Sequence, residues 1–249
     1  MNLMYLIIGR SGSGKTHLVK SLLERDFKIV KTYTTRPKRY ESEDTYHFID
    51  GDTSKYNKVV PAVINNYEYF ATEEEIENKN LFVIDPQGAV QIANHMPDTT
   101  FIIYYISADK DVRKMRTSKR HNTSFEERDK SEDEQFTEFE SHFDTDFAHL
   151  PHNIYSVTKL ENDYMPGTAQ DWAKQMHDDY KIVNKLAEMI KDIMPDLFYK
   201  LSDDGKRACV QYTTGPVFET PEHLALTAMH DDEFAGMLLR AWALKHSES

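Results

Sequence analysis

The stretch Gly9-Arg-Ser-Gly-Ser-Gly-Lys-Thr16 decides the fold of this chain. It matches the phosphate-binding pattern G-x-x-x-x-G-K-[ST] at every position. The run Leu3–Ile8 before it is apolar, which is typical of a buried parallel strand. The segment Lys15–Arg25 after it carries leucines and a valine at helical spacing. A strand, a glycine loop and a helix in this order predict an α/β protein with a P-loop NTPase-type parallel sheet flanked by helices.

The residue types of this loop suit the phosphates of ATP. Glycines let successive backbone N–H groups turn inward around phosphate oxygens, and the helix that starts there adds its positive end. Lys15 can reach the β- and γ-phosphates, and the hydroxyl of Thr16 can ligate Mg²⁺. The residues expected to bind ATP are Ser11, Gly12, Ser13, Gly14, Lys15 and Thr16. The alternative is a glycine turn that only joins a strand to a helix.

Composition narrows the class of protein. The chain has 249 residues and a formal net charge of −12, and no apolar run approaches the ~18 residues of a membrane-spanning helix. Its N-terminus lacks the basic start of a signal peptide. Cys209 is the only cysteine, so no intrachain disulfide can form. We therefore expect a cytoplasmic protein that binds no membrane and no nucleic acid, because its net charge opposes both interactions.

A basic segment follows the first helix. The stretch Phe27–Tyr33 alternates in polarity and predicts a strand, which leads into Thr34-Thr-Arg-Pro-Lys-Arg39. Pro37 disfavours a helix through Arg36, so a loop is expected. Arg36 and Arg39 could grip a phosphate with their forked guanidinium groups. The alternative is a solvated basic turn.

A second buried run, Leu81–Ile84, ends in Asp85. An acid at the carboxyl end of a strand beside a phosphate loop is where Mg²⁺ or its water shell is held. The alternative is that Asp85 caps the next helix, which Gln87–His95 predicts. The phosphate loop upstream favours the metal site.

Five motifs, in their order along the chain, resemble the guanylate kinase family. They are Gly9–Thr16, Thr34-Thr-Arg36 with Arg39, Tyr46-His-Phe48, Tyr67-Glu-Tyr-Phe-Ala-Thr72 and Leu81-Phe-Val-Ile-Asp-Pro-Gln-Gly-Ala89. The fourth is a degenerate form of the family's N-Y-Y-G-T, and the fifth is similar to its strand ending in D-x-D-x-Q-G. The resemblance implies a P-loop domain over residues 1–163, with a region that binds a nucleoside monophosphate at about 32–80 and a lid at about 107–130.

The resemblance also implies roles for individual residues in ATP-dependent phosphorylation of a nucleoside monophosphate. Lys15, Arg116 and Arg128 would stabilise charge on the transferring phosphoryl group. Thr16 and Asp85 would hold Mg²⁺. The residues that would bind the acceptor phosphate are Arg36, Arg39, Tyr46 and Tyr69.

The positions at which the family reads guanine are mostly changed. Thr32 keeps the expected hydroxyl. Val60 stands where the family has a glutamate, Ala71 where it has a serine or threonine, and Val83 where it has the first aspartate of D-x-D. Glu68 would replace the missing glutamate if the loop differs by one residue. Lost partners for a base edge can change base preference by orders of magnitude.

Three functions remain open. The first is an ATP-dependent nucleoside monophosphate kinase with an altered or broad base preference, for which deoxynucleotides, GMP and dGMP are all possible acceptors. The second is a kinase for a phosphorylated sugar or another non-nucleotide phosphate, since the phosphate-binding set is kept. The third is a non-catalytic guanylate-kinase-like interaction module, against which the intact Gly14-Lys15-Thr16 argues.

Residues 164–249 extend beyond the family's usual length and predict a small α+β appendage. Its expected elements are a helix over Ala169–Met194, hairpin strands over Phe198–Leu201 and Ala208–Tyr212, and a closing helix over Pro221–Lys245. Pro195 would end the first helix, and Asp204-Gly205 would form the hairpin turn. Its acids and histidines match no metal-ligand spacing. We expect a surface here for a protein partner or for a homo-oligomer.

Overall fold

The computed structural model describes residues 3–64, 66–118, 125–144, 146–162, 167–200 and 220–247. The chain divides into two compact units. One is formed by Leu3–Lys174, and the other by Met1–Asn2 together with Gln175–Ser249. The phosphate loop and all the predicted site residues lie in the first unit. The domain boundary expected at residues 163 and 164 stays a prediction.

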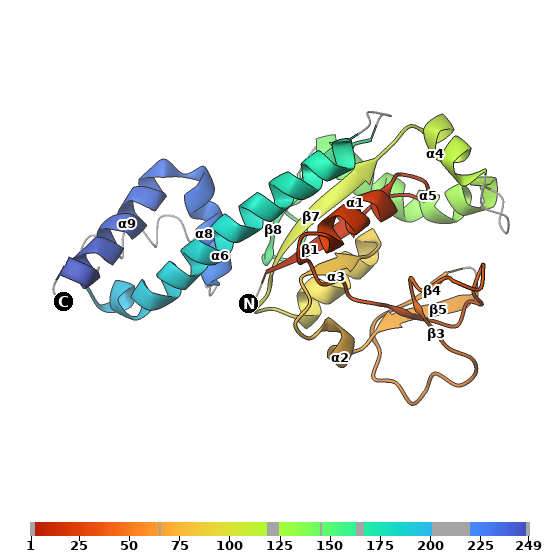
Figure 1. The fold of residues 1–249 in the computed structure, drawn as a ribbon, viewed down its shortest axis with the longest axis horizontal. Coiled ribbons are helices and arrows are strands. Elements are labelled where there is room, and N and C mark those ends of the chain that lie inside the picture. Colours follow the sequence, from red (N-terminus) through yellow and green to blue (C-terminus); the bar gives the residue numbers. More distant parts are fainter. Residues whose placement is uncertain are drawn as a thin grey trace. The chain divides into compact units, whose positions relative to one another are not determined.

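A parallel sheet forms the centre of the first unit (Figure 1). Its strands are β1 (Leu3–Ile8), β6 (Leu81–Val83), β7 (Thr100–Ser107) and β8 (Ile154–Glu161), in the order β6-β1-β7-β8. Every residue of β1 is buried, because the strand lies inside the sheet and both of its faces are covered. The predicted α/β class, a parallel sheet flanked by helices, is confirmed.

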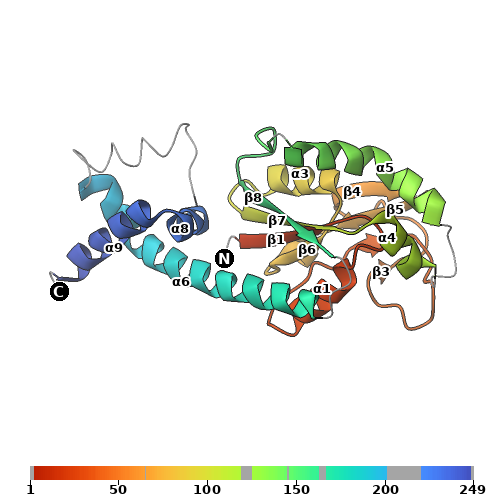
Figure 2. The same ribbon diagram turned by 90° about the horizontal axis from the view of Figure 1, so that it is seen from above.

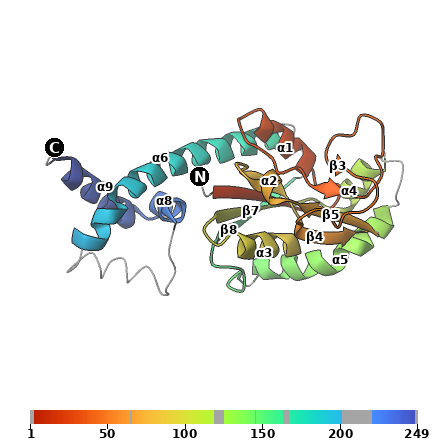
Figure 3. The same cartoon turned by 90° about the horizontal axis from the view of Figure 1, so that it is seen from below.

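Helices cover both faces of this sheet. The helix α1 (Lys15–Leu23) lies on one face, and α3 (Pro86–His95) and α5 (Phe125–Ser141) lie on the other (Figures 2 and 3). On the α3 and α5 side, Met4, Leu6 and Ile8 belong to one core cluster with Phe136 and Phe139. This core fixes α5 beside the carboxyl end of β1, where the phosphate loop begins.

A second, mixed sheet forms the region predicted to bind a nucleoside monophosphate. Its strands are β2 (Tyr33–Thr34), β3 (His47–Phe48), β4 (Val59–Ile64) and β5 (Tyr67–Ala71), in the order β3-β2-β5-β4. The structure corrects the strand predicted over Phe27–Tyr33. Only Tyr33 joins a strand, and Ile29 forms a single bridge to Leu81. The strand β4 was not predicted, because Pro61 interrupts its pattern; an edge strand tolerates a proline.

Shorter elements complete the first unit. They are α2 (Glu73–Ile76), α4 (Lys110–Thr117) and the 3₁₀ turn η1 (His142–Asp144). The helix α4 and the start of α5 flank residues 119–124, so the predicted lid is described only at its two ends.

The second unit is helical in its described residues. The helix α6 (Thr168–Lys200) continues past Pro195, which corrects the predicted stop; a proline removes one intrahelical hydrogen bond and can bend a helix without ending it. The first predicted hairpin strand overlaps α6 through Lys200, and the rest of the hairpin lies outside the described residues. None of the described helices combines the length and the apolar character needed to span a bilayer.

The predicted closing helix is two helices, α8 (Pro221–His230) and α9 (Asp232–Ser247). Asp231 separates them in an extended conformation. Its Oδ1 accepts a hydrogen bond from the N–H of Phe234 at 2.9 Å, so it caps α9. An aspartate that can cap a new helix explains why the apolar spacing alone did not reveal the break.

Candidate active site

The phosphate loop leaves β1 and enters α1 through two left-handed glycines. Gly12 has φ 84° and Gly14 has φ 109°, a region that side chains with a Cβ rarely adopt. Close packing adds a second reason. A Cβ on Gly12 would lie 2.7 Å from the carbonyl oxygen of Arg113, and one on Gly14 would lie 2.1 Å from Nδ2 of Asn162. Glycine is therefore required at both positions, as the motif predicts.

The loop fits a nucleotide phosphate. The Oγ of Ser13 is buried and lacks a hydrogen-bond partner among the described residues, and a buried hydroxyl of this kind is usually paired in a native structure. A phosphate oxygen would supply that partner. Lys15 starts α1, but its Nζ donates to the carbonyl oxygens of Gly9 at 2.5 Å and Arg10 at 3.0 Å. The lysine thus lies against the loop itself, close to where a phosphate would bind.

Arg116 and Asn162 hold the outer side of the loop. Nη1 of Arg116 donates to the carbonyl oxygens of Gly12 at 3.3 Å and Ser13 at 3.2 Å. Nδ2 of Asn162 donates to the same Ser13 carbonyl at 2.7 Å. Asn162 follows β8, at the edge of the sheet where the carboxyl ends of parallel strands meet, and this position is the signal that could have identified it. The structure therefore brings Arg116 to the phosphate loop and adds Asn162, which the sequence did not predict.

A second arginine of the predicted lid, Arg113, forms a buried ion pair. Nη1 of Arg113 lies 2.7 Å from Oδ1 of Asp129, and both side chains are buried. Arg113 is therefore an ion-paired structural residue. The side chain of Arg128 and residues 119–124 lie outside the described part of the chain.

The four predicted ligands of the acceptor phosphate lie in one neighbourhood. The guanidinium of Arg36 lies over the ring of Tyr46, 5.5 Å from its centroid, and the Tyr46 and Tyr69 rings meet edge to face at 5.7 Å. Glu43, which the sequence did not single out, joins the two arginines. It accepts from Nη2 of Arg36 at 2.8 Å and from the backbone N–H of Arg39 at 2.7 Å.

Glu43 is nearly fully buried, so its charge matters. Burial by itself would raise the pKa of this carboxyl, but the hydrogen bonds from Arg36 and Arg39 outweigh burial and lower it. The Glu43 carboxylate therefore holds the guanidinium of Arg36 in place, with its charge compensated.

The position of the missing family glutamate is apolar and strained. Val60 has φ 52°, which is a rare conformation for a β-branched residue, and it lies in an irregularity between Val59 and Ala62 in the β4–β5 pairing. A Cβ on Gly88 would lie 3.1 Å from Cγ1 of Val60 and 2.6 Å from Cγ1 of Ile84. The side chain of Val60 therefore lies close to Gly88 at the start of α3 and presents only methyl groups there.

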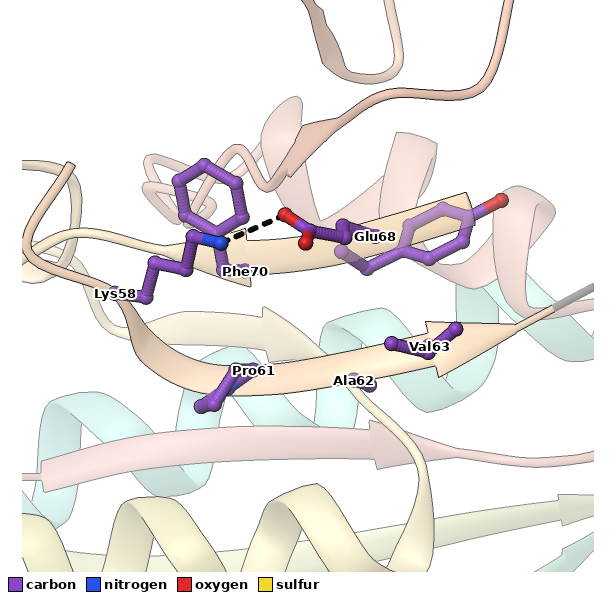
Figure 4. Close-up of a pocket in the computed structure, with 7 residues that line it drawn as sticks. Lys58, Pro61, Ala62, Val63, Glu68 and Phe70 are labelled. Atoms are coloured by element: carbon purple, nitrogen blue, oxygen red, sulfur yellow. Dashed lines mark hydrogen bonds and ion pairs between the residues drawn. The ribbon is translucent and has the colours of Figure 1, made fainter. Parts of the chain in front are cut away.

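Glu68 faces away from the acceptor cluster. Its Oε2 lies 2.7 Å from Nζ of Lys58, which also lies over the ring of Phe70 (Figure 4). Neighbouring strand residues point to opposite faces, so Tyr69 and Ala71 share the other face of β5. The hollow beside Lys58 and Glu68 measures about 120 Å³, below the ~300–1,000 Å³ of nucleotide-sized ligand sites. Glu68 is therefore not placed to take over the missing role.

Asp85 follows β6 and caps α3. Its Oδ1 accepts a hydrogen bond from the N–H of Gly88 at 2.7 Å. Burial raises the pKa of the Asp85 carboxyl, although the N–H groups of Gly88 and Gln87 act in the opposite direction. Asp85 therefore caps α3, which is one of the two roles that the sequence allowed. Its role as a ligand of Mg²⁺ stays a prediction. Across the described ranges, no three histidine, cysteine, aspartate or glutamate side chains gather as metal ligands would.

Known guanylate kinases are similar in sequence to this chain. The guanylate kinase of Hydrogenovibrio crunogenus is 29% identical over 210 residues, which cover 74% of this chain and 97% of that protein. The guanylate kinase of Legionella pneumophila (strain Paris) is 31% identical over 150 residues, covering 53% of this chain and 71% of that protein. No protein-family model matches the chain.

Among solved structures, a guanylate kinase from Anaplasma phagocytophilum aligns with a TM-score of 0.49 at 15% identity. The alignment covers 72% of this chain and 85% of that one. The assignment to a family therefore rests on the relatives in sequence and not on this structure. Fold and site define the class, a P-loop nucleoside monophosphate kinase. Within that class the chain belongs to the guanylate kinase family.

We predict that Gly14→Ala destabilises the fold through Asn162. A Cβ at a left-handed position costs about 1–2 kcal/mol, and at Gly14 it would also displace the amide that binds Ser13. Urea unfolding measures the loss. Gly51→Ala is the matched control, because Gly51 has φ 89° and nothing lies within 4 Å of its Cβ position. In an Asn162→Ala background the excess cost of Gly14→Ala should disappear; an unchanged excess would contradict the contact.

We also predict that Glu43→Gln destabilises the protein in a pH-dependent way. Removing the charge leaves Arg36 buried beside a neutral group, at a cost of about 3–5 kcal/mol at pH 7. A lowered folded pKa contributes stability that is complete above the unfolded value near 4.5 and is lost as pH falls through the folded value. The difference in unfolding free energy should therefore shrink below about pH 4. Glu41→Gln, at an exposed position, is the control. A difference that stays constant down to pH 3 would contradict this role.

Proposed function

We propose that the chain transfers the γ-phosphoryl group of ATP, with Mg²⁺, to a nucleoside monophosphate that it does not select by the family's guanine contacts. One observation carries the proposal. The phosphate-binding side chains are kept and gathered around Glu43, whereas Val60, Ala71 and Val83 offer only carbon atoms at three of the four base-reading positions.

On the donor side, the loop N–H groups would hold the phosphates of ATP, and Lys15 would turn from the carbonyl oxygens of Gly9 and Arg10 to the β- and γ-phosphates. Arg116 and Arg128 would stabilise charge on the transferring group. Thr16 and Asp85 would hold Mg²⁺, with phosphate oxygens and water as the remaining ligands. The buried Oγ of Ser13, which has no hydrogen-bond partner among the described residues, supports this part of the proposal, because a phosphate oxygen would pair with it.

On the acceptor side, Arg36 and Arg39 would bind the phosphate with Tyr46 and Tyr69. The acceptor oxygen is already anionic, so no general base is required, and catalysis consists of positioning and charge neutralisation. Glu43 supports this role, because it fixes Arg36 while leaving Arg39 partly exposed for a phosphate.

For the base, the hydroxyl of Thr32 is the one retained polar contact. A base edge placed against Val60 and Val83 would leave its donors and acceptors without protein partners, a loss that disfavours guanine relative to a site built for it. Selection would then depend on shape and on apolar contact with the base face. This accounts for a broad or altered base preference, with deoxynucleotides included among the acceptors.

The direct test is a coupled assay of ADP release with MgATP and a panel of ribo- and deoxyribonucleoside monophosphates. We expect activity with several bases, and a loss of at least a hundredfold in Lys15→Ala, because one charge at the phosphoryl group contributes several kcal/mol. Ribose 5-phosphate is included in the panel. If ribose 5-phosphate alone reacted, a sugar-phosphate kinase would replace this proposal; if GMP and dGMP alone reacted, the altered base preference would be wrong.

Restoring the guanine contacts tests the base assignment. In the triple variant Val60→Glu, Ala71→Ser and Val83→Asp, we expect kcat/KM for GMP to rise at least tenfold relative to the other monophosphates. The matched control is Val63→Glu, which adds the same charge at an exposed position of β4. Equal relative rates in the triple variant and the wild type would contradict the assignment of these three positions.

A further inference from the structure

A glutamate from α5 lies on the phosphate loop. Oε2 of Glu132 accepts a hydrogen bond from the backbone N–H of Ser11 at 2.8 Å, and its Oε1 accepts from the Ser11 hydroxyl at 2.5 Å. Ser11 is the third residue of the glycine loop, whose N–H groups are the ones that bind phosphate oxygens in proteins of this kind. A carboxylate therefore stands where the loop is built to receive an anion.

The same helix is already attached to the loop by a stronger set of contacts. Arg10 is 7% exposed. Its Nε and Nη2 each donate to Glu140 at 3.0 Å, its Nη1 donates to Asp133 at 2.9 Å, and Phe136 lies beneath the guanidinium. Bidentate pairs of this kind are the strong charge-assisted hydrogen bonds. Arg10 thus holds α5 in place without any contribution from Glu132.

We infer that Glu132 acts as an internal competitor of ATP, occupying the Ser11 N–H until the nucleotide phosphates displace it. The inference deepens the proposed function and rests on it. The Glu132 carboxylate and the ATP phosphates would both accept a hydrogen bond from the Ser11 N–H. A carboxylate held at the loop also repels an incoming triphosphate. Displacement breaks one of the two links between the loop and α5, while the Arg10 link remains. Glu132 is therefore a positioning residue, with no contact to the reacting atoms.

The test is the dissociation constant of MgATP, measured by isothermal titration calorimetry in the absence of an acceptor. We expect Glu132→Gln to bind MgATP about tenfold more tightly than the wild type, because a charged hydrogen bond no longer has to be broken. Glu132→Ala should bind at least as tightly as Glu132→Gln. Glu138→Gln is the matched control, since it removes the same charge from an exposed position of α5. Thermal unfolding of each variant verifies that the fold is intact.

The outcomes separate this inference from the proposed function. Tighter binding in both Glu132 variants, with Glu138→Gln within twofold of the wild type, supports the inference. Equal or weaker binding in the Glu132 variants, or an equal gain in Glu138→Gln, overturns it, even if the wild type phosphorylates a nucleoside monophosphate. If neither the wild type nor a Glu132 variant binds MgATP, the inference and the proposed function both fail.

Discussion

The backbone of the phosphate loop is the constraint on which the rest of the first unit depends. Two left-handed glycines shape the loop, and its carbonyl oxygens need hydrogen-bond donors. Arg116 and Asn162 supply them from α4 and from the end of β8. The buried strand β1 delivers the loop to the edge of the sheet where these elements converge. The loop thus fixes the positions of α4 and of the end of β8 through its carbonyl oxygens.

The proposed function separates phosphate recognition from base recognition. Phosphate would be bound by charge, and Glu43 positions the two arginines by hydrogen bonds within the single loop that connects β2 to β3. A base is recognised by hydrogen bonds from side chains on strand faces. Replacing a single carboxylate there with a methyl group removes the hydrogen bonds on which base selectivity depends. Val60 makes the contrast clear, because a left-handed valine with apolar neighbours occupies the position that the family gives to a glutamate.

Local patterns predicted the parts of the fold whose signals are local. The run Leu3–Ile8 and the loop Gly9–Thr16 could be interpreted from composition and spacing alone, as could the strand before Asp85. The edge strand β4 was missed because Pro61 conceals it, and the break at Asp231 was missed because a helix cap interrupts no apolar pattern. Both features become recognisable only when neighbouring elements are in place.

The same distinction holds for the site. Arg36, Arg39 and Lys15 stand in motifs, and so their positions followed from the sequence. Glu43, Asn162 and Glu132 lie outside these motifs. Asn162 and Glu132 bind loop residues that are distant in the chain, whereas Glu43 binds Arg36 and Arg39 within its own loop. Asp85 shows the remaining difficulty, since an acid after a strand satisfies the pattern of a helix cap and of a metal ligand equally well. Residue type at one position cannot separate these roles.

The most direct measurement is a crystal structure of the protein with MgADP and the monophosphate that reacts fastest. The account predicts that the acceptor phosphate lies between Arg36 and Arg39, and that the base lies against Val60 and Val83 with no carboxylate on its edge. The side chain of Glu68 should keep its ion pair with Lys58. A base held by the Glu68 carboxylate, or a phosphate bound away from the two arginines, would contradict the account.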